Sequence, residues 1–393
     1  MPQMNLKFFL RTVFVVCSLI TGYFNTFAQV LDPGTQTNGS KSSNVITAVP
    51  FLLITPDSRA AGMGEAGVAV LPDANSMSIN PSKLAFLEKQ YGFSVSYSPW
   101  LKNIVDDVNL VYVSGYFKAD GQSVIGGSLR YFSLGAIQLI DANQTSLGTY
   151  SPNEFALDAT YSRKFGETFA LGTAVRYIRS GFMSGQFSGG QDTKAASAVG
   201  VDVSAYYKQP TWFLGTDAIV SAGINISNIG TKMSYAATGN KYFLPANMKI
   251  GAASTFLLDN DNQVAVAIDF NKLLVPTQPD YDTNGNMISG KDPNKSVPAG
   301  IFGSFSDAPG GFSEEIKEVN VAAGLEYLYR KQFAFRTGYF YENPQKGDRR
   351  YFTLGAGLKI NSYAIDFSYL LASTQRSPLA NTLRFSLLFN FGN

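Results

Sequence analysis

A short acidic stretch in the second half of the chain has the spacing of a calcium-binding loop. Residues 280–286 fit the pattern D-x-D-x-N-G, which places oxygen-bearing side chains at alternate positions and a glycine at the sharp turn. Lys291 occupies the twelfth position, where a bidentate glutamate belongs, and an acid follows one residue late. The candidate ligands of this imperfect site are Asp280, Asp282, Asn284 and Asp292. The alternative is that the stretch is only the polar tip of a loop.

The rest of the chain lacks the residue types and motifs that most often carry out catalysis. The chain contains no histidine, so the usual general base, the Ser-His-Asp and Cys-His arrangements and most zinc sites are excluded. No G-x-S-x-G elbow and no phosphate-binding P-loop occurs. We therefore predict that the protein is not an enzyme and has no catalytic or cofactor-binding residues.

The composition favours a membrane β-protein. Of 393 residues only 15% are charged, whereas 13% are aromatic and 37 are glycine. A soluble domain has nearer a quarter charged residues. Mean hydropathy is about zero because polar and apolar residues alternate along the chain. The net charge of +2 falls to zero without Lys7 and Arg11, so no basic surplus exists for nucleic acid.

The N-terminus has the three regions of a secretory signal peptide. Lys7 and Arg11 precede a short apolar run at residues 12–20, and Ala28 ends a small-x-small cleavage pattern. The alternative, a membrane anchor, needs about 20 apolar residues. We expect residues 1–28 to be a signal peptide. The sole cysteine, Cys17, falls within it, so the mature chain has no disulfide.

We interpret residues 29–90 as an N-terminal periplasmic or plug segment, in which residues 45–90 alternate poorly between polar and apolar side chains. A short helix is expected over residues 80–88, opened by Pro81. From Tyr91 onward the period changes to two, as in the alternation of Tyr91, Phe93 and Val95 with small residues. Segments of roughly ten residues in which polar and apolar side chains alternate are typical of transmembrane barrels. The domain at residues 91–393 is therefore predicted to be all-β, an antiparallel transmembrane barrel.

We predict fourteen strands, and the lengths of their connections support the barrel. They span residues 91–97, 108–118, 121–133, 153–165, 167–180, 196–208, 217–228, 246–257, 262–273, 319–330, 332–342, 350–360, 362–372 and 381–391. Every second connection is mostly tight, and the others are longer. Outer-membrane barrels place short turns on the periplasmic rim and long loops outside. A soluble β-sandwich also alternates but does not sort its loops in this way.

Charged residues on the alternating strands are expected to line the lumen. They are Asp158, Asp202, Asp269, Glu326 and Asp366, with Arg130, Arg163, Arg176, Arg330, Arg336 and Lys359 in similar number. A carboxylate pair could perform acid–base chemistry, but we favour ion pairs that fill the lumen, as barrels commonly have.

Two long loops suggest contact with partners. The loop at residues 181–195 is polar and glycine-rich yet carries Phe182, Met183 and Phe187. Apolar groups on such a loop favour partner binding, and the alternative is that they fold into the barrel mouth. The connection at residues 274–318 is too long to be a simple link. Ser313 is expected to N-cap a short helix within it.

Several strings resemble the FadL-like outer-membrane barrels. Residues 56–69, PDSRAAGMGEAGVA, followed by Ile79, Asn80 and Pro81, look like the segment that precedes the barrel in that superfamily. Within it, the chain is similar to the PorV family, also called LptO, of the type IX secretion system. The matching strings are DFNKLLVPT at 269–277, DAPGGFSEE at 307–315, GYFYEN at 338–343 and PLANTLRF at 378–385.

The resemblance implies a fourteen-stranded barrel in the outer membrane of a Gram-negative bacterium, with its N-terminal segment inside or beneath it. It also implies a secretion role, in which the protein binds C-terminal signal domains of cargo. The implied partners are a large translocon barrel, a surface attachment complex and outer-membrane lipid. The competing hypothesis is a FadL-type channel for hydrophobic small molecules. A third, a lipopolysaccharide deacylase, is weakened by the absence of histidine.

Overall fold

The computed structural model describes residues 45–102, 105, 107–140, 145–181, 185–187, 191–236, 240–282, 284, 286–373 and 379–392. The predicted signal peptide, residues 1–28, and residues 29–44 lie outside these residues. No helix among the described residues is long and apolar enough to cross a membrane. Residues 43–393 form one compact unit.

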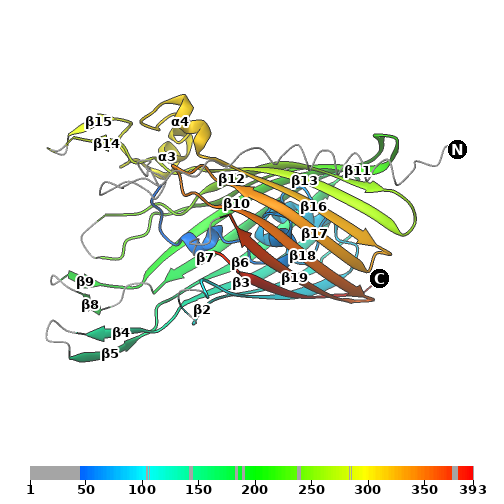
Figure 1. The fold of residues 1–393 in the computed structure, drawn as a ribbon, viewed down its shortest axis with the longest axis horizontal. Coiled ribbons are helices and arrows are strands. Elements are labelled where there is room, and N and C mark those ends of the chain that lie inside the picture. Colours follow the sequence, from blue (N-terminus) through cyan, green and yellow to red (C-terminus); the bar gives the residue numbers. More distant parts are fainter. Residues whose placement is uncertain are drawn as a thin grey trace. The chain divides into compact units, whose positions relative to one another are not determined.

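Fourteen antiparallel strands close into a barrel, which confirms the predicted fold and strand number (Figure 1). Pairing of the first strand with the last, from Tyr91 opposite Phe391 to Tyr97 opposite Phe385, closes the sheet. The strands are β1 Tyr91–Pro99, β2 Val108–Lys118, β3 Ser123–Leu134, β6 Asn153–Phe165, β7 Phe169–Ser180, β10 Ala196–Phe213, β11 Thr216–Gly230, β12 Asn247–Leu257, β13 Asn262–Leu273, β16 Val319–Tyr329, β17 Phe333–Tyr341, β18 Arg350–Ile360, β19 Tyr363–Ala372 and β20 Leu383–Phe391.

The alternation of side chains follows from the pleat of the strands. Along β1, Tyr91, Phe93, Val95 and Tyr97 are exposed on the outer wall, and the intervening glycine and serines are buried inside. Closure leaves no sheet edge, so the backbone groups of the wall pair within the sheet, as hydrocarbon surroundings require. The outer wall therefore presents apolar side chains to lipid.

One hairpin is longer than predicted. The strands expected at residues 196–208 and 217–228 extend to Phe213 and from Thr216. Pro210 interrupts the alternation in the sequence, but its nitrogen faces the side on which β7 has already ended. The Lys208 amide, two residues earlier, makes the last bond to that side, at Thr168 O. A proline at such an edge costs no ladder hydrogen bond, so pairing with β11 continues.

The long loops carry their own elements at one end of the barrel (Figure 1). Three hairpins consist of β4 Ile137–Ile140 with β5 Ser146–Tyr150, β8 Gly185–Phe187 with β9 Gln191–Thr193, and β14 Asp280–Tyr281 with β15 Met287–Ser289. Two short helices, α3 Val297–Gly303 and α4 Phe312–Lys317, follow in the loop at 274–318. The predicted helix around Ser313 is present, but Gly311 is its N-cap and Ser313 lies inside it.

Residues 45–90 form an interior segment that packs on inward-facing side chains of the strands (Figure 1, blue). Its elements are η1 Pro50–Leu53, α2 Ser58–Gly62, η2 Ser76–Ser78 and η3 Pro81–Phe86. The helix expected over residues 80–88 is thus a shorter 3-10 helix. Asn80 caps it, because its side-chain oxygen accepts a hydrogen bond from Ser82 N at 3.1 Å.

Candidate functional site

Inward-facing glycines on neighbouring strands form slots for the interior segment. Gly324 and Gly338 are cross-strand partners on β16 and β17, and the backbone of Met63 lies against both. A Cβ atom on Gly338 would stand 2.1 Å from the Met63 carbonyl carbon, and one on Gly324 would stand 2.5 Å from the Met63 oxygen. Since non-bonded carbons normally approach to about 3.5–4.0 Å, only glycine allows this contact. This role of the glycines was not predicted from the sequence.

A second cross-strand glycine pair, Gly223 and Gly251, receives the next turn of the interior segment. A Cβ atom on Gly223 would lie 2.2 Å from Val68 O. The carboxylate of Asp269 closes this slot, because its Oδ2 accepts hydrogen bonds from the amides of Gly67 and Val68 at 2.7 and 2.8 Å. Asp269 thus faces inward as predicted, but it binds backbone amides of the interior segment.

An ion cluster anchors α2 to the two strands that carry the first glycine slot, and to β19. Arg59 contacts Glu326 at 2.8 Å and Asp73 at 3.1 Å. Glu326 also pairs with Arg336 at 2.6 Å, and Arg336 reaches Asp366 at 2.5 Å. All five side chains are at least four-fifths buried. The cluster therefore crosses the interface between the interior segment and strands β16, β17 and β19.

A second cluster belongs to the barrel wall alone. Arg176 contacts Asp158 at 2.5 Å and Asp202 at 3.0 Å and also donates to Asn228. Arg130, in contrast, donates to Leu52 O of the interior segment at 2.7 Å. These contacts confirm that the lumen holds ion pairs.

Three of the predicted lumen bases are exposed: one faces outward, and two lie at the ends of strands. Arg163 points outward from β6 and is exposed, so the prediction placed it on the wrong face of the strand. Lys359 and Arg330 are exposed near the short turns, where the strands project beyond the interior packing.

Two buried ionisable groups of the interior segment have shifted pKa values. Burial, followed by the nearby charge of Asp73, raises the pKa of Asp57 to about 6. The carboxylate still accepts a hydrogen bond from Ala60 N at 2.9 Å and so caps α2. Burial lowers the pKa of Lys83 to about 8, and its ammonium donates to Gly67 O at 2.8 Å. At neutral pH both groups are mostly charged, with hydrogen-bond partners.

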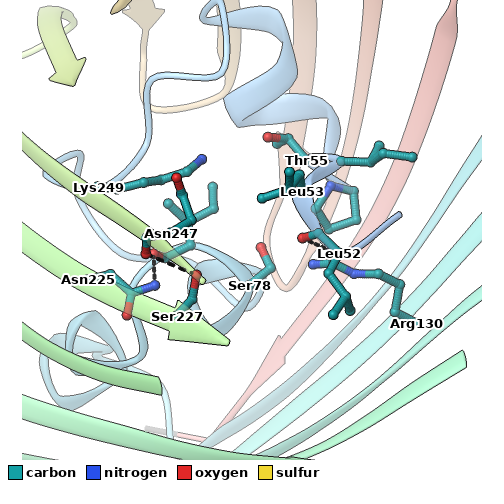
Figure 2. A pocket seen from close by; sticks show the side chains of 12 residues that line it. Leu52, Leu53, Thr55, Ser78, Arg130, Asn225, Ser227, Asn247 and Lys249 are labelled. Atoms are coloured by element: carbon teal, nitrogen blue, oxygen red, sulfur yellow. Dashed lines mark hydrogen bonds between the residues drawn. The ribbon is translucent and has the colours of Figure 1, made fainter. Parts of the chain in front are cut away.

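A small polar cavity lies between the interior segment and the wall (Figure 2). Its volume is about 30 Å³, which suits one or two water molecules. Leu52, Thr55 and Arg130 stand on one side, and Asn225, Asn247 and Lys249 face them from the other. An apolar cavity that holds benzene has about 150 Å³, so this cavity does not suit a hydrocarbon.

The partner-binding candidates can be placed only in part. Phe182 and Met183 lie outside the described residues. The backbone of Phe187 ends β8 in the β8–β9 hairpin, and its side chain is outside the description. The hairpin belongs to the end of the barrel that carries the long loops. Partner binding by these three residues stays a prediction.

The calcium candidates occupy the β14–β15 hairpin and the turn after it. Asp282 Oδ1 accepts hydrogen bonds from the amides of Asn284 and Asn286 at 2.9 and 2.8 Å. Asp292 accepts one from Asn294 N at 2.8 Å, and Asp280 one from Ser289. Within the described part of the chain, no three His, Cys, Asp or Glu side chains gather in a metal-binding group. Each carboxylate is engaged in its own local turn, and calcium binding also stays a prediction.

If calcium binds here, it should slow proteolysis of the hairpin. At a calcium concentration 100 times the Kd, the ligand stabilises the closed loop by about 2.7 kcal/mol, so cleavage at residues 278–293 should fall about 100-fold. Purified barrel is titrated with calcium, with magnesium and an Asp282→Asn variant as controls. Cleavage that is unchanged by calcium rules the site out.

Comparisons with known proteins agree on family and fold. The family model described as type IX secretion system protein PorV matches residues 37–280. The structure of the Pseudomonas putida toluene transporter TodX is similar at 13% identity and a TM-score of 0.52, covering 86% of this chain and 99% of that one. A Pseudomonas aeruginosa FadL homologue has 12% identity and a TM-score of 0.46, with 86% and 99% covered. No curated protein sequence matches the chain.

Proposed function

The chain belongs to the family of type IX secretion system protein PorV, and from that premise we propose that it carries exported proteins and is not a channel for small solutes. Family and fold identify it as an outer-membrane barrel of a Gram-negative bacterium and a component of type IX secretion. In the proposed role it binds C-terminal signal domains of cargo at its long-loop end. It then passes them from the translocon barrel to the surface attachment complex, without catalysis.

The family match carries this proposal, and the filled lumen supports it. The interior segment lies in glycine slots on β16 and β17 and on β11 and β12, and a buried ion cluster holds α2. Opening a path through the barrel would break these contacts together. The long-loop end, in contrast, carries separate hairpins that can bind a partner while the barrel stays intact.

The competing function is a channel for hydrophobic molecules, as the name of the toluene transporter TodX describes for that protein. The similarity to TodX concerns the fold only, at 13% identity. A channel would need the interior segment to move, whereas the carrier needs only its outer loops. The two functions therefore predict different effects of changes in the loop at 181–195.

Deletion of residues 181–195 should strand cargo in the periplasm while the barrel remains folded. A hot-spot side chain at an interface contributes about 2 kcal/mol or more, so the milder triple change of Phe182, Met183 and Phe187 to serine should weaken cargo binding at least about 30-fold. Binding is measured by pull-down of cargo from detergent-solubilised membranes. The matched control replaces Ile137 and Ile140 of β4, two exposed apolar residues on a neighbouring hairpin, with serine.

Normal secretion by the deletion variant would contradict the carrier function. Loss of toluene uptake with normal secretion would favour the channel. Heat-modifiable migration on gels shows whether each variant has folded, so a folding defect is recognised separately.

A further inference from the structure

The loop at 274–318 folds back onto the outer wall of the barrel. On β13, Asp269 faces inward, because it bonds to the interior segment, and Phe270 is exposed on the outside. The pairing of β13 with β12 and β16 is regular through this region. Lys272, two residues beyond Phe270, therefore also points outward, yet its side chain is buried. Part of the loop must cover it.

Helix α4 provides this cover through its acidic face. Lys272 Nζ contacts Glu315 Oε2 at 3.0 Å and Glu318 Oε2 at 2.6 Å. Lys346 contacts Glu318 Oε1 at 3.0 Å from the neighbouring loop. Glu315 and Glu318 are three residues apart and share one face of the helix, which turns toward the wall, whereas the side chains of Phe312 and Ile316 are exposed. The helix thus buries its charges and exposes its apolar residues.

Helix α3 lies on the same outer wall. Ile226 and Met248 are cross-strand partners in the outward register of β11 and β12. Val297 and Ile301 of α3 pack around the same cluster, which also contains Phe243 and Leu274. Both helices therefore stand beside the wall, and in Figure 1 α4 lies beyond the outline of the barrel strands.

Four exposed apolar side chains of α3, α4 and the segment between them are here called the collar face: Phe302, Phe305, Phe312 and Ile316. Phe302 and Phe312 are 78% and 79% exposed. Large apolar groups exposed together mark a contact site. Lys291 flanks this surface, with its ammonium 3.0 Å from Ser306 Oγ beside Phe305.

We propose that the collar face lies in the outer surface of the membrane, with its aromatic side chains among the lipid acyl chains and Lys291 at the phosphate level. This membrane contact would lie next to the lipid-facing wall. Phe270 is exposed on that wall only two residues, about 7 Å, before Lys272, which α4 covers. Amphipathic elements with aromatic residues on one side and lysine beside them bind membrane interfaces in this way. The collar would fix the height and tilt of the barrel beneath its long loops.

Spin labels can test the depth of the collar in vesicles that contain no partner protein. Single cysteines replace Phe302, Phe312 and Ile316 in a Cys17→Ser background, and the labelled barrel is reconstituted in phosphatidylcholine–phosphatidylglycerol vesicles. Two reference sites calibrate the measurement: Leu354→Cys on the outer wall of β18 and Ile140→Cys on the β4–β5 hairpin, both exposed. Collisions with oxygen report lipid, and collisions with a water-soluble nickel chelate report water.

We expect the collar labels to have an oxygen-to-chelate ratio severalfold above that of Ile140 and close to that of Leu354. Ratios equal to that of Ile140 would show that the collar face stands in water and would overturn the proposal. The result does not depend on the secretion role, because the vesicles contain neither cargo nor translocon.

Discussion

Valine at Gly338 should drive the interior segment out of its slot and open the barrel to ions. A Cβ atom there would stand 2.1 Å from the Met63 carbonyl carbon and 2.2 Å from Gly64 N. Overpacking of a core typically costs about 1–3 kcal/mol, and here the obstacle is backbone, which no change of rotamer relieves. We therefore expect a cost of at least about 3 kcal/mol. Planar-bilayer recordings should show steady conductance in the variant and little in the unchanged protein, and residues 45–90 should become sensitive to protease.

Gly115→Val is the matched control. Gly115 is also a strand glycine, but a Cβ atom there meets its nearest neighbour at an ordinary 3.6 Å. This variant should keep the closed state of the parent. If Gly338→Val were equally non-conducting and equally resistant to protease, the glycine slot would not hold the interior segment.

The barrel could be predicted from the sequence because lipid and the filled interior impose a period of two on every strand. β2, β6, β13 and β18 have the predicted bounds, and the other strands differ mostly at their ends. The main exception, β10, was predicted to end at residue 208 but continues past Pro210 to Phe213. Whether a strand proline costs a ladder hydrogen bond is not visible in one strand alone. It depends on where the neighbouring strand ends.

The interior contacts could not be predicted, because they join residues far apart in the chain. Asp269 and Gly67 are separated by 202 positions. The available signal was the presence of glycine at inward positions of neighbouring strands, such as Gly324 and Gly338, where a packed wall would otherwise carry side chains. Periodicity identifies the inward face but does not reveal what fills it.

The orientation of α4 illustrates a second limit. Ordinary amphipathic reasoning would bury Phe312 and Ile316 and expose Glu315 and Glu318. The structure reverses this arrangement, because Lys272 of β13 lies beneath the helix and provides an opposite charge for both acids. Only the register of β13 in the closed barrel shows that this lysine points outward.

Methionine at Arg336 should destabilise the barrel by about 3–5 kcal/mol, the usual cost of leaving a buried charge without its partner. Arg336 joins Glu326 and Asp366 at 2.6 and 2.5 Å, and its side chain is buried. Methionine keeps much of the volume of the arginine side chain, so the loss of stability reflects the lost charge more than lost packing. After the change Glu326 retains Arg59, but Asp366 loses its ion-pair contact with Arg336. Denaturant unfolding in lipid vesicles, followed by tryptophan fluorescence, measures the free energy of unfolding.

Two comparisons separate charge from simple loss of a side chain. Arg330→Met removes an exposed pair, in which the guanidinium lies 3.6 Å from Asp261, and should cost no more than about 1 kcal/mol. Adding Glu326→Gln and Asp366→Asn to Arg336→Met removes the uncompensated charges and should restore most of the stability, as neutral replacements of buried ion clusters can. If the triple variant were as unstable as Arg336→Met, packing and not charge would account for the effect. Recovery, in contrast, would show that the cost of Arg336→Met comes from the uncompensated buried charge of Glu326 and Asp366, the two carboxylates that Arg336 contacts.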